Sequence, residues 1–153
     1  MRDFDRPLDQ RGTADAALVS KAMADEGLLP DTVLCSPARR CVETFEILSR
    51  HLPVDCPAHY PEGLYDKAHS YYLDLVSRHG GGTLLVVGHN PMMEDTARAL
   101  ALTAEEWPGH RLRKGFPTAG LAVIDLEPGG TTGGHLSRFL TPKRLKKLHS
   151  GAP

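Results

Sequence analysis

The sequence is poor in cysteine and in aromatic residues, and it contains no long apolar run. Of its 153 residues, 3 are cysteine and 6% are aromatic, while 41% are hydrophobic and 24% are charged, which is typical of a globular domain. No apolar run approaches the roughly 18 residues of a membrane-spanning helix, and no signal-peptide core follows Met1. We therefore expect a cytoplasmic protein that does not bind a membrane.

An excess of charge of either sign is also missing. Lysine and arginine together number 18, aspartate and glutamate 19, and the formal net charge is −1. Proteins that coat nucleic acid or anionic lipid need a strongly basic surface, so this balance argues against both classes. The basic run at 142–147 is accordingly expected to be a solvated helix face, with no nucleic-acid partner.

Cysteine and histidine do not form a metal-binding pattern. The cysteines are odd in number and match no ligand spacing, which predicts free thiols in a reducing compartment: Cys35, Cys41 and Cys56. Four histidines recur at even intervals, at His59, His69, His79 and His89. Because that interval matches neither a helix face nor a strand face, we expect neither a metal nor another cofactor.

The length fits one domain, which we expect to cover residues 1–153. Helical and strand patterns alternate along the chain, as is typical of an α/β layered sheet. Helices are expected over 13–26, 36–51, 67–78, 89–102 and 142–149, strands over 32–35, 83–88, 120–126 and 135–140, and a loop over 52–64. Gly27 suits the C-cap of the first helix, and Ser36 with Pro37 suits the start of the second.

Two strand-to-helix junctions place polar side chains where ligands bind in α/β sheets. Arg40 lies near the start of one helix and His89 at the start of another, each beyond the carboxyl end of a strand. Helix N-termini favour a phosphate there, and an imidazole can donate to a phosphoryl oxygen or move a proton. Taken singly, however, such an arginine is more often a surface ion pair and such a histidine a helix cap.

Other catalytic motifs for phosphate or acyl transfer are absent from the sequence. There is no G-x-x-x-x-G-K-[ST] phosphate loop and no G-x-S-x-G nucleophile elbow. A cysteine phosphatase loop needs an arginine six positions after its cysteine, but the residue in that position after Cys35 is Cys41. These three reaction classes are therefore excluded.

Five short motifs occur along the chain in a recognisable order. They are Asp5-Arg-Pro-Leu8 with Arg11-Gly12, Ser36-Pro-Ala-Arg-Arg40 with Glu43-Thr44, Gly88-His-Asn-Pro91, Thr118-Ala-Gly-Leu-Ala-Val123 and Phe139-Leu-Thr-Pro-Lys143. Together they resemble the small phosphohistidine phosphatases of the histidine phosphatase superfamily, the group related to phosphoglycerate mutase. Each motif alone is weak, but the ordered set covers nearly the whole chain.

The resemblance implies a three-layer α/β/α sandwich with a mostly parallel central sheet, and a pocket with two histidines and several arginines. In that family one histidine takes the phosphoryl group from the substrate, and water then hydrolyses the phosphohistidine intermediate. Arg40 matches the arginine of the Ser-Pro-x-x-Arg motif, and Arg39 is expected to be its surface neighbour. His89 matches the second histidine, and Arg6 the arginine of Arg-Pro-Leu. The resemblance thus implies that His89 and Arg40 are catalytic and that both bind phosphate with Arg6.

The sequence departs from the family at its amino end. The family's Arg-His pair, whose histidine is the nucleophile, ends the first strand a short distance before Arg-Pro-Leu. This sequence starts past that point, and its Arg-His pairs at 50–51 and 78–79 fall near predicted helix ends. The phospho-accepting histidine and the first strand are thus missing, through N-terminal truncation, which we favour, or because the chain is a genuinely shortened relative.

A missing central strand has a physical consequence for the neighbouring strands. Their backbone donors and acceptors lose their partners, at a cost of about 1–3 kcal/mol for each group that stays buried. If the short chain folds, we expect a rearranged segment or a strand of a partner chain to fill the gap. The second case predicts a homo-oligomer.

The resemblance implies a phosphohistidine phosphatase that acts on a phosphoprotein or a small phosphorylated molecule. Relatives that act on phosphate esters use a carboxylate acid after the third strand; Glu62 and Asp66 lie in that region but match it poorly. A phosphoramidate needs less help from an acid, which favours phosphohistidine as the substrate. The alternative is a non-catalytic module that binds phosphate or a phosphoprotein in the same pocket.

Overall fold

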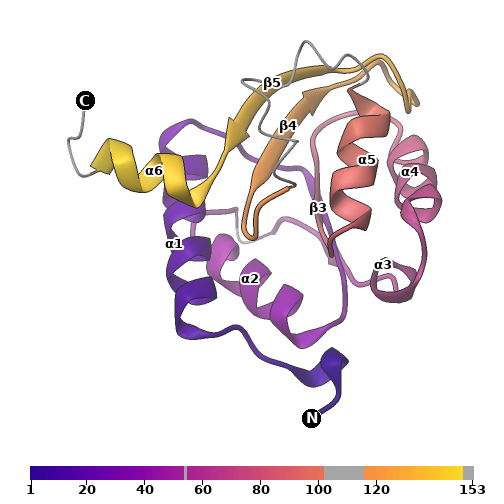
Figure 1. Ribbon diagram of the computed structural model, residues 1–153. Coiled ribbons are helices and arrows are strands. Elements are labelled where there is room, and N and C mark those ends of the chain that lie inside the picture. Colours follow the sequence, from indigo (N-terminus) through magenta and orange to yellow (C-terminus); the bar gives the residue numbers. More distant parts are fainter. Residues whose placement is uncertain (54, 102–115, 150–153) are drawn as a thin grey trace.

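The computed structural model describes residues 1–53, 55–101 and 116–149 (Figure 1). The helices are η1 (Asp3–Asp5), α1 (Gln10–Asp25), α2 (Arg39–Ser49), α3 (Gly63–Asp66), α4 (His69–Arg78), α5 (Met92–Leu100) and α6 (Pro142–His149). The strands are β1 (Thr32–Cys35), β2 (Ala58–His59), β3 (Leu84–Val87), β4 (Leu121–Asp125) and β5 (His135–Leu140). Helices and strands therefore alternate over most of the chain, as predicted.

β1 is the middle strand of a parallel three-stranded sheet with the order β2-β1-β3. Its Val33 pairs with Ala58 of β2 on one side and with Leu85 of β3 on the other. Val33 and Cys35 are fully buried, as expected for a short β-branched and apolar strand with neighbours on both edges. The parallel arrangement brings the carboxyl ends of β1 and β3 to the same edge of the sheet.

β4 and β5 form a separate antiparallel pair, with a register shift between Val123 and Ile124. α1 packs against α2 and α6, while α4 packs against α5. In Figure 1 these two groups of helices lie on opposite sides of the strands. The predicted layered α/β fold with a mostly parallel sheet is confirmed, although the strands within the described residues form two separate sheets instead of one.

Several helices begin at residues other than those predicted, including α4, which begins at His69 and not at 67. For α1 and α2 the reason is a side-chain hydrogen bond that the sequence did not reveal. α1 begins at Gln10, ahead of the predicted residue 13, since the Asp9 carboxylate accepts a hydrogen bond of 2.7 Å from the N–H of Gly12. α2 begins at Arg39, three residues later than predicted. Ser36 does not cap this helix, because its hydroxyl oxygen contacts His89 and the N–H of Ala38.

Two further predictions of secondary structure, the loop over 52–64 and the helix over 89–102, differ from the structure. The segment 52–64 is not purely a loop, since it contains β2 and the start of α3. β2 has only two residues, too few for any alternation of apolar and polar side chains to reveal it. The predicted helix 89–102 begins later, at Met92, and its predicted end lies outside the described residues.

The main hydrophobic core lies between the parallel sheet and the helices α1 and α2. Met23, Val33, Leu48 and Leu85 are among its buried members, and they come from α1, β1, α2 and β3. A second, smaller cluster contains Phe139 of β5 with residues of α5 and β4. Every helix within the described ranges is too short or too polar to cross a bilayer.

Candidate functional site

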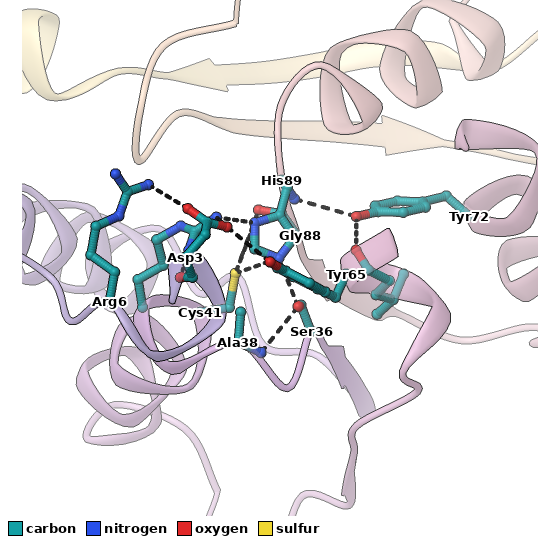
Figure 2. Close-up of polar contacts among 11 residues, drawn as sticks. Asp3, Arg6, Ser36, Ala38, Cys41, Tyr65, Tyr72, Gly88 and His89 are labelled. Carbon is teal, nitrogen blue, oxygen red and sulfur yellow. Dashed lines mark hydrogen bonds and ion pairs between the residues drawn. The ribbon is translucent and has the colours of Figure 1, made fainter. Parts of the chain in front are cut away.

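The candidate site lies beyond the carboxyl ends of the neighbouring strands β1 and β3. Ser36 directly follows β1, and His89 follows β3 after a single glycine. Figure 2 shows both side chains pointing toward one another, with residues from η1, α2 and α3 around them. The two strand-to-helix junctions singled out in the sequence therefore meet in space.

The His89 ring is held by a hydrogen bond at each of its nitrogens. Nε2 lies 2.7 Å from the Ser36 hydroxyl oxygen, and Nδ1 lies 3.1 Å from an Nη atom of Arg40. Because a guanidinium can only donate, Nδ1 must accept, and the ring proton of the neutral form sits on Nε2 and is donated to Ser36. Arg40 and Ser36 thus fix both the tautomer and the orientation of the ring.

Burial keeps this histidine neutral. His89 is 9% exposed, and its removal from water, followed by the positive charge of Arg40, lowers its pKa from 6.5 to about 4. The negative charge of Asp3 opposes this shift but is the weaker influence. At neutral pH the ring therefore offers an N–H donor and carries no charge.

The backbone of His89 is also fixed, by a hydrogen bond to Tyr72. The Tyr72 hydroxyl accepts a hydrogen bond of 3.3 Å from the His89 N–H and donates to the carbonyl oxygen of Leu64. Burial of this phenol raises its pKa to about 12. A Cβ at Gly88 would lie 2.7 Å from the Tyr72 hydroxyl, so the close approach of tyrosine to this loop requires glycine there.

Cys41 also lies against His89 but does not have the properties of a nucleophile. Its sulfur is 3.5 Å from Nε2 of the histidine and lies near the carbonyl oxygen of Gly88. Burial raises the pKa of this thiol to about 11, and the opposing effect of Arg40 is weaker. The thiol therefore stays protonated at neutral pH, which agrees with the absence of a cysteine phosphatase motif.

Arg40, and not its neighbour Arg39, faces the site. Its guanidinium donates to the backbone oxygen of Asp3 at 2.9 Å and to the Asp3 carboxylate at 3.2 Å, while it also reaches His89. Arg39 instead pairs with Glu43 at 3.3 Å. The Arg40 side chain is 23% exposed and that of Arg39 56%, so the predicted division between a site arginine and a surface arginine agrees with the geometry.

Three donors from separate parts of the chain meet on the carboxylate of Asp3. Arg6 contacts one oxygen at 3.0 Å, and Arg40 and the Tyr65 hydroxyl contact the other at 3.2 and 3.0 Å (Figure 2). The hydrogen bond from Tyr65, together with the charges of Arg40 and Arg6, lowers the pKa of Asp3. Arg6, Arg40 and Tyr65 are therefore already arranged to bind a negatively charged oxygen, here that of the Asp3 carboxylate.

A cavity of about 360 Å³ adjoins these side chains. Arg6, Arg40 and His89 all line it, together with Thr118 and Ala119 from one of the sequence motifs. All three predicted site residues are thus brought to one cavity, although Arg6 meets Arg40 only through Asp3. Neither an aspartate nor a glutamate occurs among the described residues that line it, which leaves out Glu62 and Asp66.

Sequence reasoning missed two members of the site, Asp3 and Tyr65. Tyr65 packs edge-on against the rings of Phe4, at 5.0 Å between centroids, and of His89, at 5.5 Å. Neither residue lies in a motif, and no local pattern relates them to each other. Within the described part of the chain, His, Cys, Asp and Glu form no group of three or more that could hold a metal ion.

Comparison with known proteins gives the family and the fold of the chain. Residues 2–67 match the sequence family described as the histidine phosphatase superfamily (branch 1). An uncharacterized protein of Mycobacterium tuberculosis is 37% identical over 142 residues, which cover 83% of this chain and 85% of that protein.

Solved structures show the same fold. The SixA protein of Agrobacterium tumefaciens, named as a candidate phosphohistidine phosphatase, is 34% identical and superimposes with a TM-score of 0.81, covering 93% of this chain and 87% of its own. The protein histidine phosphatase SixA in complex with tungstate has a TM-score of 0.74 at 22% identity, covering 94% and 89% of the two chains. The chain therefore belongs to the histidine phosphatase superfamily.

Proposed function

We propose that the group formed by Arg6, Arg40 and His89 binds the phosphoryl group of a phosphorylated histidine. The observation that carries this proposal is the Asp3 carboxylate, which receives donors from Arg6, Arg40 and Tyr65. Donors arranged around one anionic oxygen suit a phosphoryl oxygen equally well, since both are charged acceptors of similar hydrogen-bond length.

The proposed roles follow from the charge of a transferring phosphoryl group. That charge spreads over the equatorial oxygens, and fixed donors stabilise it. Arg40 offers a planar fork that suits two such oxygens, and the Nε2–H of His89 would donate to a third once the bound phosphoryl group displaces the Ser36 hydroxyl as its acceptor. Arg6, with a side chain 62% exposed, lies at the outer side and would neutralise charge on the bound group.

The proposed reaction is hydrolysis in two steps. The phosphorus–nitrogen bond of the substrate breaks as a bond forms to an acceptor histidine, and the substrate imidazole, already protonated on its other nitrogen, keeps the electron pair and leaves as the neutral ring. Water then adds to phosphorus, the bond to the acceptor breaks, and inorganic phosphate leaves. Nδ1 of His89 accepts a hydrogen bond from Arg40 and Nε2 carries the ring proton, so neither nitrogen offers a free lone pair, and we assign this histidine the role of donor and not of acceptor.

The cavity favours a phosphoramidate over a phosphate ester. Ester hydrolysis benefits from a carboxylic acid that protonates the leaving oxygen, and the described residues lining the cavity include none. A protonated imidazole is a good leaving group without such an acid. The names of the structural relatives support the same substrate class.

A second function, phosphoryl binding without turnover, has its own support. His89 is the one histidine among the described residues that line the cavity, and its ring nitrogens are bonded to Arg40 and Ser36. An acceptor histidine would have to come from elsewhere. Without one, the same donors would form a binding module for phosphate or a phosphoprotein.

The two functions can be separated with one protein preparation. Binding of inorganic phosphate is measured by calorimetry, and release of phosphate is measured from a phosphohistidine-containing protein and from p-nitrophenyl phosphate. Binding with hydrolysis of the phosphohistidine supports the phosphatase, and binding without hydrolysis supports the binding module. If phosphate binding is absent, or is unchanged in Arg40→Ala, both are wrong.

A further inference from the structure

A tight turn over residues 117–120 borders the candidate site and has no role in the function proposed above. It overlaps one of the five sequence motifs, and it lines the cavity of about 360 Å³ together with the proposed phosphoryl-binding side chains. The N–H of Gly120 donates to the carbonyl oxygen of Pro117 at 2.9 Å, which closes the turn directly ahead of β4. We call this segment the 117–120 turn.

The backbone of this turn is strained. Ala119 has a φ of 59°, and within the described ranges it is the one residue other than glycine with a positive φ. This left-handed region favours glycine, because a Cβ there comes too close to the backbone. A Cβ at Gly120 would lie 2.9 Å from the carbonyl oxygen of Pro117, so the next position has no room for a side chain. Strained turns persist where their surroundings hold them, and they gather at ligand sites.

Two side chains near the start of α5 hold the residue ahead of the turn. The side-chain amide of Asn90 donates to the carbonyl oxygen of Phe116 at 2.9 Å, and Oε1 of Glu94 accepts from the N–H of Phe116 at 2.7 Å. The Phe116 ring also packs against that of Phe139, at 5.5 Å between centroids. Because Asn90 directly follows His89 in the sequence, these bonds fix the turn relative to the histidine.

The turn contributes a single hydroxyl to the lining of the cavity. Thr118 is exposed, and its hydroxyl can both donate and accept a hydrogen bond. Its neighbours in the lining are apolar, among them Phe116, Pro117 and Ala119. The cavity volume falls in the range of small-molecule sites, so there is room for more than a phosphoryl group. A flat ring with one polar edge would suit these walls.

We propose that the 117–120 turn binds the leaving group of the substrate and that Thr118 selects an imidazole ring. This inference rests on the proposed function, because it takes the phosphoryl group of a phosphorylated histidine to lie at Arg6, Arg40 and His89. The ring attached to that phosphoryl group lies against the turn. The Thr118 hydroxyl accepts a hydrogen bond from the ring nitrogen that is not phosphorylated.

This hydrogen bond favours the reactive form of the substrate. The ring leaves as neutral imidazole only when its second nitrogen already carries a proton. A hydroxyl that accepts from this N–H stabilises the protonated ring. A phenyl ring has a similar size but no N–H, so it gains nothing from Thr118. Asn90 and Glu94 are positioning residues, since they act through Phe116.

Calorimetric titration with three probes tests the role of Thr118. The probes are inorganic phosphate, phenylphosphonate and imidazol-4-ylphosphonate, whose phosphorus–carbon bond is not hydrolysed. We expect the chain to bind the imidazole probe about 5- to 10-fold more tightly than the phenyl probe, the usual effect of one hydrogen bond. Thr118→Ala should remove this preference, and Thr118→Ser should keep it. Thr132→Ala changes an exposed threonine in another turn and is the control, which should also keep it.

Glu94 tests the positioning of the turn. Glu94→Ala removes the acceptor of the Phe116 N–H, whereas Glu94→Gln retains an acceptor oxygen. The alanine variant should lose the preference for the imidazole probe, and the glutamine variant should retain it. Asp95→Ala removes the same charge from the same turn of α5 and is the matched control. A merely structural role would weaken all three probes alike, so the ratio of the two ring affinities is the quantity to measure.

The outcomes separate this inference from the proposed function. If inorganic phosphate does not bind, the proposed function is wrong and the inference fails with it. If phosphate binds but the two ring probes bind equally well, only the inference is overturned. The same holds if Thr118→Ala retains the full preference for the imidazole probe. Equal losses for all three probes in Glu94→Ala would overturn the positioning role of Glu94.

Discussion

Two serine–histidine pairs lie at opposite ends of α2, one with Ser36 just before it and one with His51 just after it, and only the first belongs to the candidate site. Ser36 and His89 are 2.7 Å apart, and Ser20 and His51 are 2.6 Å apart. In both pairs the serine is buried almost completely. Distance and serine burial therefore do not distinguish them.

The surroundings of the two histidines distinguish the two pairs. His51 is exposed just beyond the end of α2, and its partner Ser20 also bonds to the carbonyl oxygen of Ile47. His89 is buried, and its second ring nitrogen meets Arg40, which in turn meets Asp3. A serine–histidine contact becomes part of the candidate site here because charged groups from distant segments converge on it.

Removal of Arg40 should have the largest effect, since it is the group that the His51 pair lacks. We expect Arg40→Ala to weaken the binding of inorganic phosphate by about 10- to 100-fold, the usual effect of losing a charged hydrogen bond. Arg39→Ala is the matched control and should change the affinity less than twofold, because Arg39 bonds to Glu43 at the surface. Calorimetric titration measures both. Equal losses in the two variants would show that the effect is one of overall charge.

The pH dependence of stability should also separate the two histidines. The pKa of His89 is about 4 in the folded chain and 6.5 ordinarily, so between these values the unfolded chain binds a proton that the folded chain does not. Stability is therefore complete above pH 6.5 and falls as the pH drops toward 4. Allowing for solvent screening, we expect a loss of about 2 kcal/mol from this residue.

Urea unfolding between pH 7.5 and 4.5 measures this loss. His89→Gln cannot titrate and should lose less stability over this range than the unsubstituted chain. His51→Gln is the control, because it removes an exposed histidine from the other pair. The interpretation is wrong if His51→Gln flattens the pH profile as much as His89→Gln does.

The sequence was sufficient to predict that Arg40 and His89 lie close together, because each follows a strand in an ordered motif. Parallel strands bring such junctions to one edge of a sheet, so a local pattern leads to a contact in space. Asp3 and Tyr65 could not be found in this way. Their hydrogen bond joins residues 62 positions apart in the sequence, and neither residue type nor periodicity marks it.

The bounds of the helices and strands could likewise be predicted only where a local sequence pattern sets them. The strand over His135–Leu140 and the helix over Pro142–His149 have the predicted bounds, because periodicity and proline fix them. The start of α2 was predicted three residues early, since a serine after a strand is normally read as a cap. The hydroxyl of that serine, Ser36, bonds instead to His89. The two residues are 53 positions apart in the sequence, so no local sequence pattern reveals this contact.

Tyr72 gives a smaller test, because it supports the backbone of one histidine only. The N–H of His89 donates to the Tyr72 hydroxyl, whereas the N–H of His51 bonds within the helix end, to Leu48. Tyr72→Phe should leave two buried groups unpaired and lower the free energy of unfolding by about 1–3 kcal/mol. Tyr71→Phe, at a half-buried position, is the control and should cost less. A similar loss in both variants, measured by urea unfolding, would contradict this role for the hydroxyl.

Asp3 should give the smallest effect, and one of opposite sign. Its carboxylate occupies donors of Arg6 and Arg40 that a phosphoryl group needs, so Asp3→Asn should strengthen phosphate binding, by about two- to fivefold for an exposed pair. Asp5→Asn makes the same change in net charge beside Arg2 and should leave the affinity nearly unchanged. Calorimetry at constant ionic strength compares them. If Asp3→Asn weakens binding, the carboxylate assists the anion site instead of competing for it, because it holds the two guanidinium groups in place.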